Sequence, residues 1–405
     1  MAVDAGLLAC RDQLVAWRRD IHAHPELGFR EVRTSGIVAA ALAGFGLEVL
    51  KDFCPARTAV VGVLRTGRPG RTVAIRADMD ALPMQDEKDV PYRSQNPGVC
   101  HACGHDGHTA TLLAVAQYCA AHPEEFTGTL KFVFQPAEEG PAPGGAKYIM
   151  ESGVLDDVDY MIAGHQSTYT SVGQIVVRPG VVCASGDSFS VELSGPGTHA
   201  VSPQDGADVI VAAVQIIDSW QSMMTRRVDP QQAAVLSVCS LHAGEPGARN
   251  VLPSSAVFSG TLRTFREDLR ARLHTEMRRR AEQIAAFCGC SCRVEIEPHF
   301  PVLYSDPAVT ALLQEQAARV VGADAVFVAP EPSMGSEDFA YYAQKIPSSY
   351  FMYGVRNEAK GIVYGGHHPR FDLDEDALLV AMDVFLHAAK ALARLPAPEK
   401  SAGAD

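Results

Sequence analysis

The feature that most constrains this chain is a short polar stretch, Cys100-His101-Ala102-Cys103-Gly104-His105-Asp106-Gly107-His108-Thr109, which leads directly into an apolar run. The stretch combines thiols, imidazoles and a carboxylate within ten residues. Burying such groups is unfavourable unless they are paired or bind an ion, and transition metals prefer thiolate and imidazole ligands. The stretch therefore predicts a metal site, for which other segments must supply the remaining ligands.

Composition limits the class of protein. The chain has 405 residues, of which 47% are hydrophobic and 20% charged, which is typical of a globular protein with a sizeable core. The net charge of −13 argues against a nucleic-acid partner, and no apolar run reaches the roughly 18 residues that span a bilayer. Ten cysteines without a small disulfide scaffold, and no recognisable signal peptide, favour a cytoplasmic location.

Polar side chains follow three predicted strands, at 72–77, 129–134 and 159–164. In open α/β sheets, ligands bind in the crevice outside the carboxyl ends of the strands, so an α/β fold would gather these side chains. A similar run at 58–64 precedes the first strand, and the connecting Gly67-Arg68-Pro69-Gly70 predicts a β-hairpin between the two. The polar residues after the three strands are Asp78, Asp80, Glu138, Glu139 and His165.

Residues 186–298 differ from the rest of the chain. Their patterns predict the order strand, helix, strand, strand, helix, strand, which is the ferredoxin-like unit. We therefore expect an inserted domain at 186–298 that interrupts a catalytic domain made of residues 1–185 and 299–405.

Five side chains from four loops are the candidate metal ligands. Thiolate, imidazole and carboxylate together suit Zn²⁺, Mn²⁺, Co²⁺ or Ni²⁺, and five ligands exceed the need of one tetrahedral ion. Two divalent ions that share a bridging ligand are therefore expected. The candidates are Cys103, His105, Glu139, His165 and His367.

The doublet Glu138-Glu139 predicts the catalytic chemistry. One carboxylate can bind metal while its neighbour takes a proton from a water molecule, whose pKa falls to about 7 on a metal. Other polar groups stay open between two interpretations. Asp78, Asp80 and Asp106 either orient ligand histidines or cap loops, and a supporting position suits His108 better than ligation.

The sequence resembles the M20 metallopeptidase/amidohydrolase family, in particular its aminoacylase, hippurate hydrolase and auxin-conjugate amidohydrolase branch. The resemblance covers nearly the whole chain. Its landmarks are Arg18-Arg-Asp-Ile-His-Ala-His-Pro-Glu-Leu-Gly-Phe29, Arg76-Ala-Asp-Met-Asp-Ala-Leu-Pro83, Cys103-Gly-His-Asp-Gly-His108, Pro136-Ala-Glu-Glu139, Gly164-His165, Gly195-Pro-Gly-Thr-His199, Asn250-Val-Leu-Pro253, Gly260-Thr-Leu-Arg263, Met334-Gly-Ser-Glu-Asp-Phe339 and His367-His-Pro-Arg-Phe371.

The resemblance implies a zinc-peptidase-like α/β catalytic domain, with a mixed central sheet flanked by helices, and a ferredoxin-like lid that forms homodimers or homotetramers. It implies that the five candidate ligands bind two metals and that Glu138 is the general base. It further implies that His199 steadies the oxyanion, in related enzymes from the neighbouring subunit. Asn250 and Arg263 would position the substrate, with Arg263 suited to a carboxylate.

We therefore expect an amidohydrolase that cleaves N-acyl amino acids, such as N-acetyl or N-benzoyl compounds, to a carboxylic acid and a free amino acid. The alternatives are a metallo-carboxypeptidase or dipeptidase, a catalytically silent binding homologue, or a thiol hydrolase that uses Cys103. The chain departs from the family pattern at Gln166-Ser167-Thr168-Tyr169, which follows His165, and at Ser305. The first departure lies beside the expected metals and leaves the acyl preference open.

Overall fold

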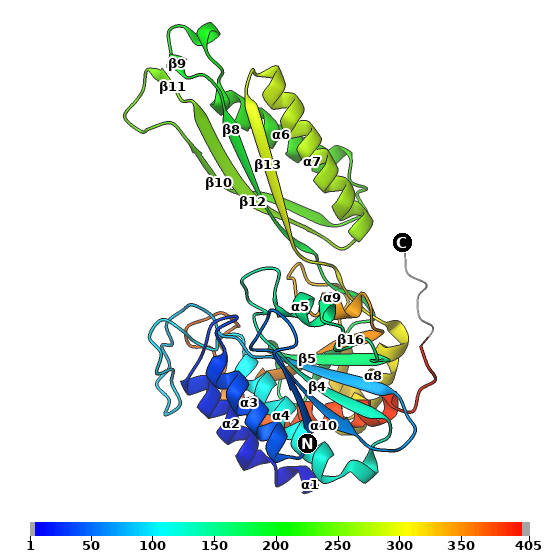
Figure 1. Ribbon diagram of the computed structural model, residues 1–405. Coiled ribbons are helices and arrows are strands. Elements are labelled where there is room, and N and C mark those ends of the chain that lie inside the picture. The colour runs from blue at the N-terminus through cyan, green and yellow to red at the C-terminus, as the bar shows by residue number, and fades with distance from the viewer. Residues whose placement is uncertain (1–4, 399–405) are drawn as a thin grey trace. The chain divides into compact units, whose positions relative to one another are not determined.

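The computed structural model describes residues 5–398, which form two compact units (Figure 1). We call them the large unit and the inserted unit. The large unit comprises residues 5–182, 304–332 and 338–398, and the inserted unit comprises residues 183–303 and 333–337. The inserted unit therefore contains the predicted segment 186–298, a few residues on either side of it, and the short loop 333–337 from later in the chain.

A mixed eight-stranded sheet forms the centre of the large unit, in the order β1-β2-β4-β3-β5-β16-β6-β15. Strand β3 runs parallel to both β4 and β5, and β5 runs parallel to β16. The strands are β1 (Glu48–Lys51), β2 (Val60–Arg65), β3 (Thr72–Asp78), β4 (Thr129–Gln135), β5 (Tyr160–Ser171), β6 (Ile175–Val177), β15 (Val326–Val328) and β16 (Ser348–Arg356), with a separate pair β7 (Gly180–Cys183) and β14 (Leu303–Ser305).

Helices cover both faces of this sheet (Figure 1), as expected for the α/β class. Helix α4 is deeply buried, with every residue from His105 to Ala116 shielded from solvent, which explains the apolar sequence that follows its first turn. Within residues 5–398, no helix combines the length and apolar character needed to cross a bilayer. The helices are α1 (Ala5–Leu8), α2 (Arg11–Ala23), α3 (Val32–Gly44), α4 (His105–Ala121), α5 (Gly145–Glu151), α8 (Pro307–Val321), α9 (Ala340–Ala343) and α10 (Asp376–Leu392).

The predicted hairpin between 58–64 and 72–77 is wrong, because β4 lies between β2 and β3. Helix α4 connects β3 to β4 as a crossover, which makes these two strands parallel and leaves the other edge of β4 for β2. The loop after β2 pairs with the start of β4 instead: the Thr66 amide donates to the Gly128 carbonyl at 3.2 Å. The glycines of that loop therefore lie in a bend of the chain and not in a hairpin turn.

The inserted unit has a four-stranded antiparallel sheet in the order β10-β12-β8-β13, with helices α6 and α7 packed against it (Figure 1). Its secondary structure follows the predicted order. The aromatic rings of Phe189 and Phe258 pack against Trp220 in its core. The elements are β8 (Gly186–Ser194), β9 (Thr198–His199), α6 (Val209–Arg226), β10 (Ala234–Ala243), β11 (Val251–Leu252), β12 (Ser255–Thr264), α7 (Glu267–Phe287) and β13 (Ser291–Phe300).

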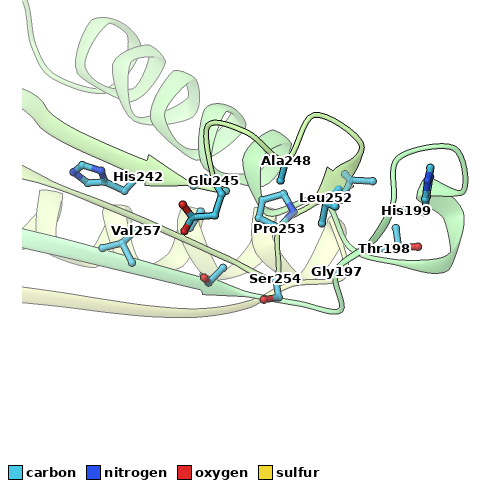
Figure 2. Close-up of a pocket in the computed structure, with 15 residues that line it drawn as sticks. Gly197, Thr198, His199, His242, Glu245, Ala248, Leu252, Pro253, Ser254 and Val257 are labelled. Carbon is cyan, nitrogen blue, oxygen red and sulfur yellow. The ribbon is translucent and has the colours of Figure 1, made fainter.

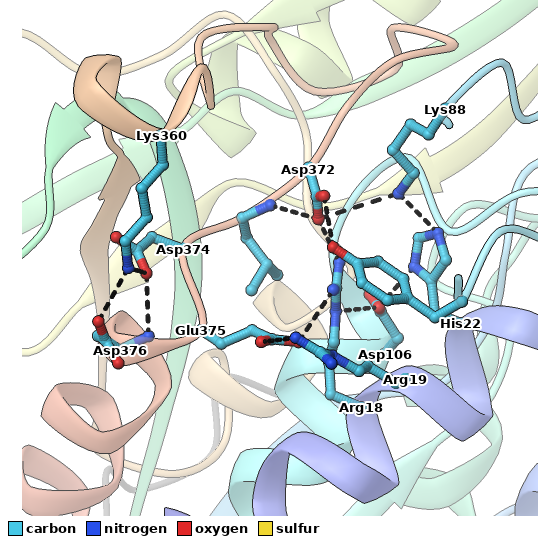
Figure 3. A network of polar contacts seen from close by, with 12 residues as sticks. Arg18, Arg19, His22, Lys88, Asp106, Lys360, Asp372, Asp374, Glu375 and Asp376 are labelled. Atoms are coloured by element: carbon cyan, nitrogen blue, oxygen red, sulfur yellow. Dashed lines mark hydrogen bonds and ion pairs between the residues drawn. The ribbon is translucent and has the colours of Figure 1, made fainter. Parts of the chain in front are cut away.

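A buried arginine joins distant parts of the large unit. Arg18, on α2, is fully buried and binds three carboxylates, those of Asp106 at 2.9 Å, Asp372 at 2.6 Å and Glu375 at 3.3 Å (Figure 3). Burial disfavours the charge on Arg18, but these carboxylates outweigh burial and hold its pKa well above the ordinary value. The contacts fasten α2 to the first turn of α4 and to the loop that leads into α10.

We expect Arg18→Ala to destabilise the large unit by about 3–5 kcal/mol, because it leaves buried carboxylates without a counter-charge. Arg11→Ala is the matched control: it removes an exposed ion pair with Asp376 (2.8 Å) and should cost less than about 1 kcal/mol. Guanidinium unfolding of the metal-free protein measures both losses. Equal losses in the two variants would contradict a structural role for the buried arginine.

Candidate metal centre

The candidate ligands meet at one edge of the central sheet. Since β3, β4 and β5 are parallel, the segments that follow them emerge on the same side. Donor atoms lie within 4.8 Å of one another in two groups of three, and the groups share the Cys103 sulfur. The groups are Cys103, His105 and His165, and Cys103, Glu139 and His367.

Both histidines of the first group present Nε2 to the cluster. The Nδ1 of His105 donates to Asp80 Oδ1 at 3.2 Å, and that of His165 donates to the Gln166 carbonyl at 2.7 Å. Each anchor fixes the tautomer that leaves the Nε2 lone pair available for a metal. The Nε2 of His165 lies 3.4 Å from the Cys103 sulfur, and the Nε2 of His105 is buried without a hydrogen-bond partner in the described residues. A metal ion would satisfy this orphaned nitrogen.

His108 supports the cluster without being able to join it. Its Nδ1 donates to Asp78 at 2.5 Å, and its Nε2 accepts the Gln166 amide at 3.1 Å, so both ring nitrogens are occupied. Asp78 is held in turn by the buried guanidinium of Arg76 at 2.7 Å. This arrangement agrees with the supporting position that the sequence favoured for His108.

The carboxylate doublet reaches the cluster from the loop after β4. The Glu139 Oε1 lies 2.9 Å from His367 Nε2, and the Glu138 Oε2 lies 4.0 Å from His105 Nε2. Burial alone would raise the pKa of Glu139, but the hydrogen bond from His367 and the charge of His105 hold it below its ordinary value. Glu138 is buried and Glu139 is half-buried, so the catalytic candidate is the better shielded of the two carboxylates.

Two residues of the cluster loops have left-handed backbone conformations, which are unfavourable for side chains other than glycine. These are Ala137, at φ 54°, and His367, at φ 61°. The Ala137 amide donates to Glu31 Oε1 at 2.9 Å, and the His367 amide donates to the Ala102 carbonyl at 2.8 Å. Strain that surrounding contacts maintain is typical of functional sites.

Gly104 makes the turn from Cys103 into α4. Its φ of 82° is left-handed, and a Cβ there would lie 2.8 Å from the Gln166 side chain. Gln166 also donates from Nε2 to the Cys103 carbonyl at 3.1 Å. The departure from the family pattern at Gln166 therefore braces the loop that carries the thiol, a role that its position after His165 did not reveal.

A separate group, His22, Asp86 and Cys100, also has donor atoms close enough for a metal. There, however, Lys88 Nζ lies 2.7 Å from His22 Nε2 and supplies the positive charge itself (Figure 3). The other nitrogen of His22 donates to Asp106 at 2.7 Å. His22 thus braces the start of α4, a contact that only the fold could show.

The remaining candidates lie in the inserted unit. His199, on β9, borders a pocket of about 740 Å³, and Figure 2 shows it at the opposite end from His242. Its Nδ1 accepts the Val201 amide at 3.2 Å, which leaves an Nε2–H donor. Asn250 is exposed beside β11, the partner of β9, and Arg263 Nη1 donates to the Met334 carbonyl at 2.9 Å.

We expect metal uptake to release protons and the metal affinity to rise with pH. Hydrogen bonds to Cys103 and Glu139 raise the pKa of His367 to about 10, and burial raises that of the Cys103 thiol. A metal must displace these protons, so the dissociation constant should fall at least about tenfold per pH unit between pH 7 and 9. Chelator competition measures the affinity, and calorimetry in two buffers measures the protons.

His387→Ala, which changes a histidine on α10 with a half-exposed side chain, is the control and should leave the affinity unchanged. An affinity independent of pH would contradict the protonated metal-free cluster.

Comparison with known proteins agrees with this geometry. The chain is 38% identical to N-acetylcysteine deacetylase of Bacillus subtilis (94% of this chain, 97% of the relative) and 38% identical to thermostable carboxypeptidase 2 of Saccharolobus solfataricus (91% and 92%). A crystal structure of Bacillus subtilis YXEP, described as a dinuclear metal binding peptidase from the M20 family, superimposes with a TM-score of 0.81 at 35% identity (95% and 99% covered). The model of Peptidase family M20/M25/M40 matches residues 74–391, and the chain belongs to this family of metal-dependent hydrolases.

Proposed function

We propose that this hydrolase cleaves the amide bond of N-acyl amino acids with two divalent metal ions per chain. The observation that carries the proposal is the buried Glu138 beside a cluster of sulfur, nitrogen and oxygen donors. A carboxylate in that position suits amide hydrolysis, because it can take a proton from the attacking water and pass it to the amide nitrogen. The products would be a carboxylic acid and a free amino acid.

The five donors Cys103, His105, Glu139, His165 and His367 would hold the metals. Bound divalent ions supply Lewis-acid chemistry that polarises an amide carbonyl and acidifies water. The sulfur of Cys103 favours Zn²⁺, while the carboxylate and imidazoles also suit Mn²⁺, Co²⁺ or Ni²⁺. A thiol hydrolase is disfavoured, because burial raises the pKa of Cys103 and leaves the nucleophilic thiolate scarce until a metal displaces the proton.

Glu138 moves the proton. Its carboxylate would accept a proton from the attacking water and donate it to the amide nitrogen as the bond to the acyl carbon breaks. Asp80 and Asp78 hold the imidazoles around it, so the carboxylate works against fixed neighbours. This division assigns ligation to Glu139 and proton transfer to Glu138.

His199 would stabilise the oxyanion through Nε2–H, since its Nδ1 is already an acceptor for Val201. Arg263 keeps guanidinium N–H groups beyond the one bonded to Met334, and these would bind the substrate carboxylate together with Asn250. Following the family pattern, we assign His199 to the active site of a neighbouring subunit.

A homodimer formed through the inserted unit would supply that neighbour. Strand β10 is an edge of its sheet and exposes Val235 and Leu241, so it can pair with another strand. Ile210, Val211 and Val214 form an exposed apolar face on α6. All ten cysteines are free thiols, which supports a cytoplasmic location.

A metallo-carboxypeptidase or dipeptidase is the second candidate, favoured by the similarity to thermostable carboxypeptidase 2. The two functions differ in the group attached to the amide carbonyl. Comparing N-acetyl and N-benzoyl amino acids with dipeptides that carry a free amino group separates them.

We expect Glu138→Gln to retain its metals and to lose activity by a factor of at least about 100, because the amide cannot accept the proton. Metal analysis and release of amino acid from N-benzoylglycine measure the two properties. Glu151→Gln, at an exposed position on α5, is the control and should match the wild type. Activity of Glu138→Gln within a few-fold of wild type would exclude Glu138 as the base.

We expect His199→Ala to lose activity by about 100-fold or more with its metals retained. If His199 acts on a neighbouring subunit, co-expression of His199→Ala with Glu138→Gln restores one complete site in each mixed dimer. About a quarter of the wild-type activity should then return. A mixture as inactive as its parents would place His199 in its own subunit's site or outside the reaction.

A further inference from the structure

A cavity of about 500 Å³ opens beside Glu139 within the large unit. Three segments build its walls: the loop after α2, the residues after β3 and the loop after β4. Glu139 belongs both to this cavity and to the donor cluster, so the two share a wall. The main lining side chains are Leu27, Phe29, Arg30, Pro83, Glu139 and Pro141.

We propose that this cavity binds the acyl group of the substrate and selects apolar, ring-sized acyl groups over acetyl. The proposal rests on the proposed function and names its substrate class. Ligand cavities typically measure about 300–1,000 Å³, and the methyl of an acetyl group would leave most of this space to water. An aromatic acyl group would replace that water with contacts to Leu27, Phe29 and the prolines.

The cavity is preformed. A Cβ on Gly28 would lie 1.8 Å from the Gly140 carbonyl oxygen, so the two loops that face each other touch through their backbones. Leu27 also forms a β-bridge with Ala81. These contacts fix the walls before a ligand arrives, which reduces the entropy lost on binding.

Phe29 is held in place although its backbone is strained. Its φ of 59° is left-handed, and its ring packs edge-on against Tyr148 at a centroid distance of 5.9 Å. A bulky residue in this conformation is unusual and is typical of functional sites. It is the third such residue in this region, after Ala137 and His367.

The charges of the walls favour the acyl half of the substrate over the amino-acid half. Arg30 is the only cationic lining side chain, and it is exposed. A substrate carboxylate in this cavity would lie beside the carboxylate of Glu139, and apart from the exposed Arg30 the other lining side chains are apolar and offer no counter-charge. An unpaired carboxylate is costly there, whereas an apolar acyl group is favoured.

The test compares kcat/KM for N-benzoylglycine and N-acetylglycine with the metal-loaded protein. We expect the wild type to prefer the benzoyl substrate by about tenfold or more. Phe29→Asn should reduce this ratio at least about tenfold, since asparagine tolerates the left-handed backbone but removes the apolar wall. Phe327→Asn, which replaces a partly exposed aromatic residue on β15, is the matched control and should keep the wild-type ratio.

Leu27→Trp is the second variant and fills the cavity instead of opening it. It should also lower the benzoyl-to-acetyl ratio, so the test stands if Phe29→Asn fails to fold. A ratio equal in the wild type and a folded variant overturns the proposal. A change confined to the ratio between N-benzoylglycine and N-benzoylleucine overturns it too, since the cavity would then bind the amino-acid half. Metal-loaded wild type that hydrolyses no N-acyl amino acid refutes the proposed function itself, and the cavity proposal falls with it.

Discussion

The parallel pairing of β3 with β4 and β5 is the constraint on which the candidate site depends. It brings segments that are far apart in sequence, the ends of three strands, to one edge of the sheet. Antiparallel pairing of any two would send their polar ends to opposite edges. Helix α4 enforces the parallel arrangement as the crossover from β3 to β4, and its first turn carries His105. One connection therefore sets both the direction of the strands and the position of a candidate ligand.

Around that edge, two of the candidate ligand histidines are each oriented by a hydrogen bond from the ring nitrogen that faces away from the cluster. His105 is anchored through Asp80 and His165 through a backbone carbonyl, while His108 has both nitrogens occupied. The same imidazole chemistry thus gives two candidate ligands and one support, and the difference lies only in the partners. Buried carboxylates are in turn stabilised by Arg76 and Arg18, so the cost of burying charge is spread over several ion pairs.

Much of the fold and of the candidate site was predictable from local patterns, because short segments of sequence indicate where a strand ends and which polar residues follow it. The positions of β3, β4 and β5 followed from hydrophobic runs, and the candidate donors Glu139 and His165 from the residues behind them, while Cys103 and His105 were conspicuous in their own polar stretch. The strand order did not, since a glycine-containing loop after β2 is compatible with a hairpin or a bend. The roles of His22 and Gln166 were also hidden. Both form hydrogen bonds with residues more than 60 positions away in the sequence, and no local pattern predicts such a contact.

The groups proposed for catalysis divide between the two compact units, and this division would separate two tasks. The donor cluster, Glu138 and the proposed acyl cavity consist entirely of residues of the large unit, so metal binding and acyl recognition would depend on the packing of that unit. His199, Asn250 and Arg263 belong to the inserted unit, where they would recognise the oxyanion and the carboxylate. Substitutions in the inserted unit can therefore change turnover while leaving metal content intact, whereas damage to the Arg18 network should affect metals and turnover together.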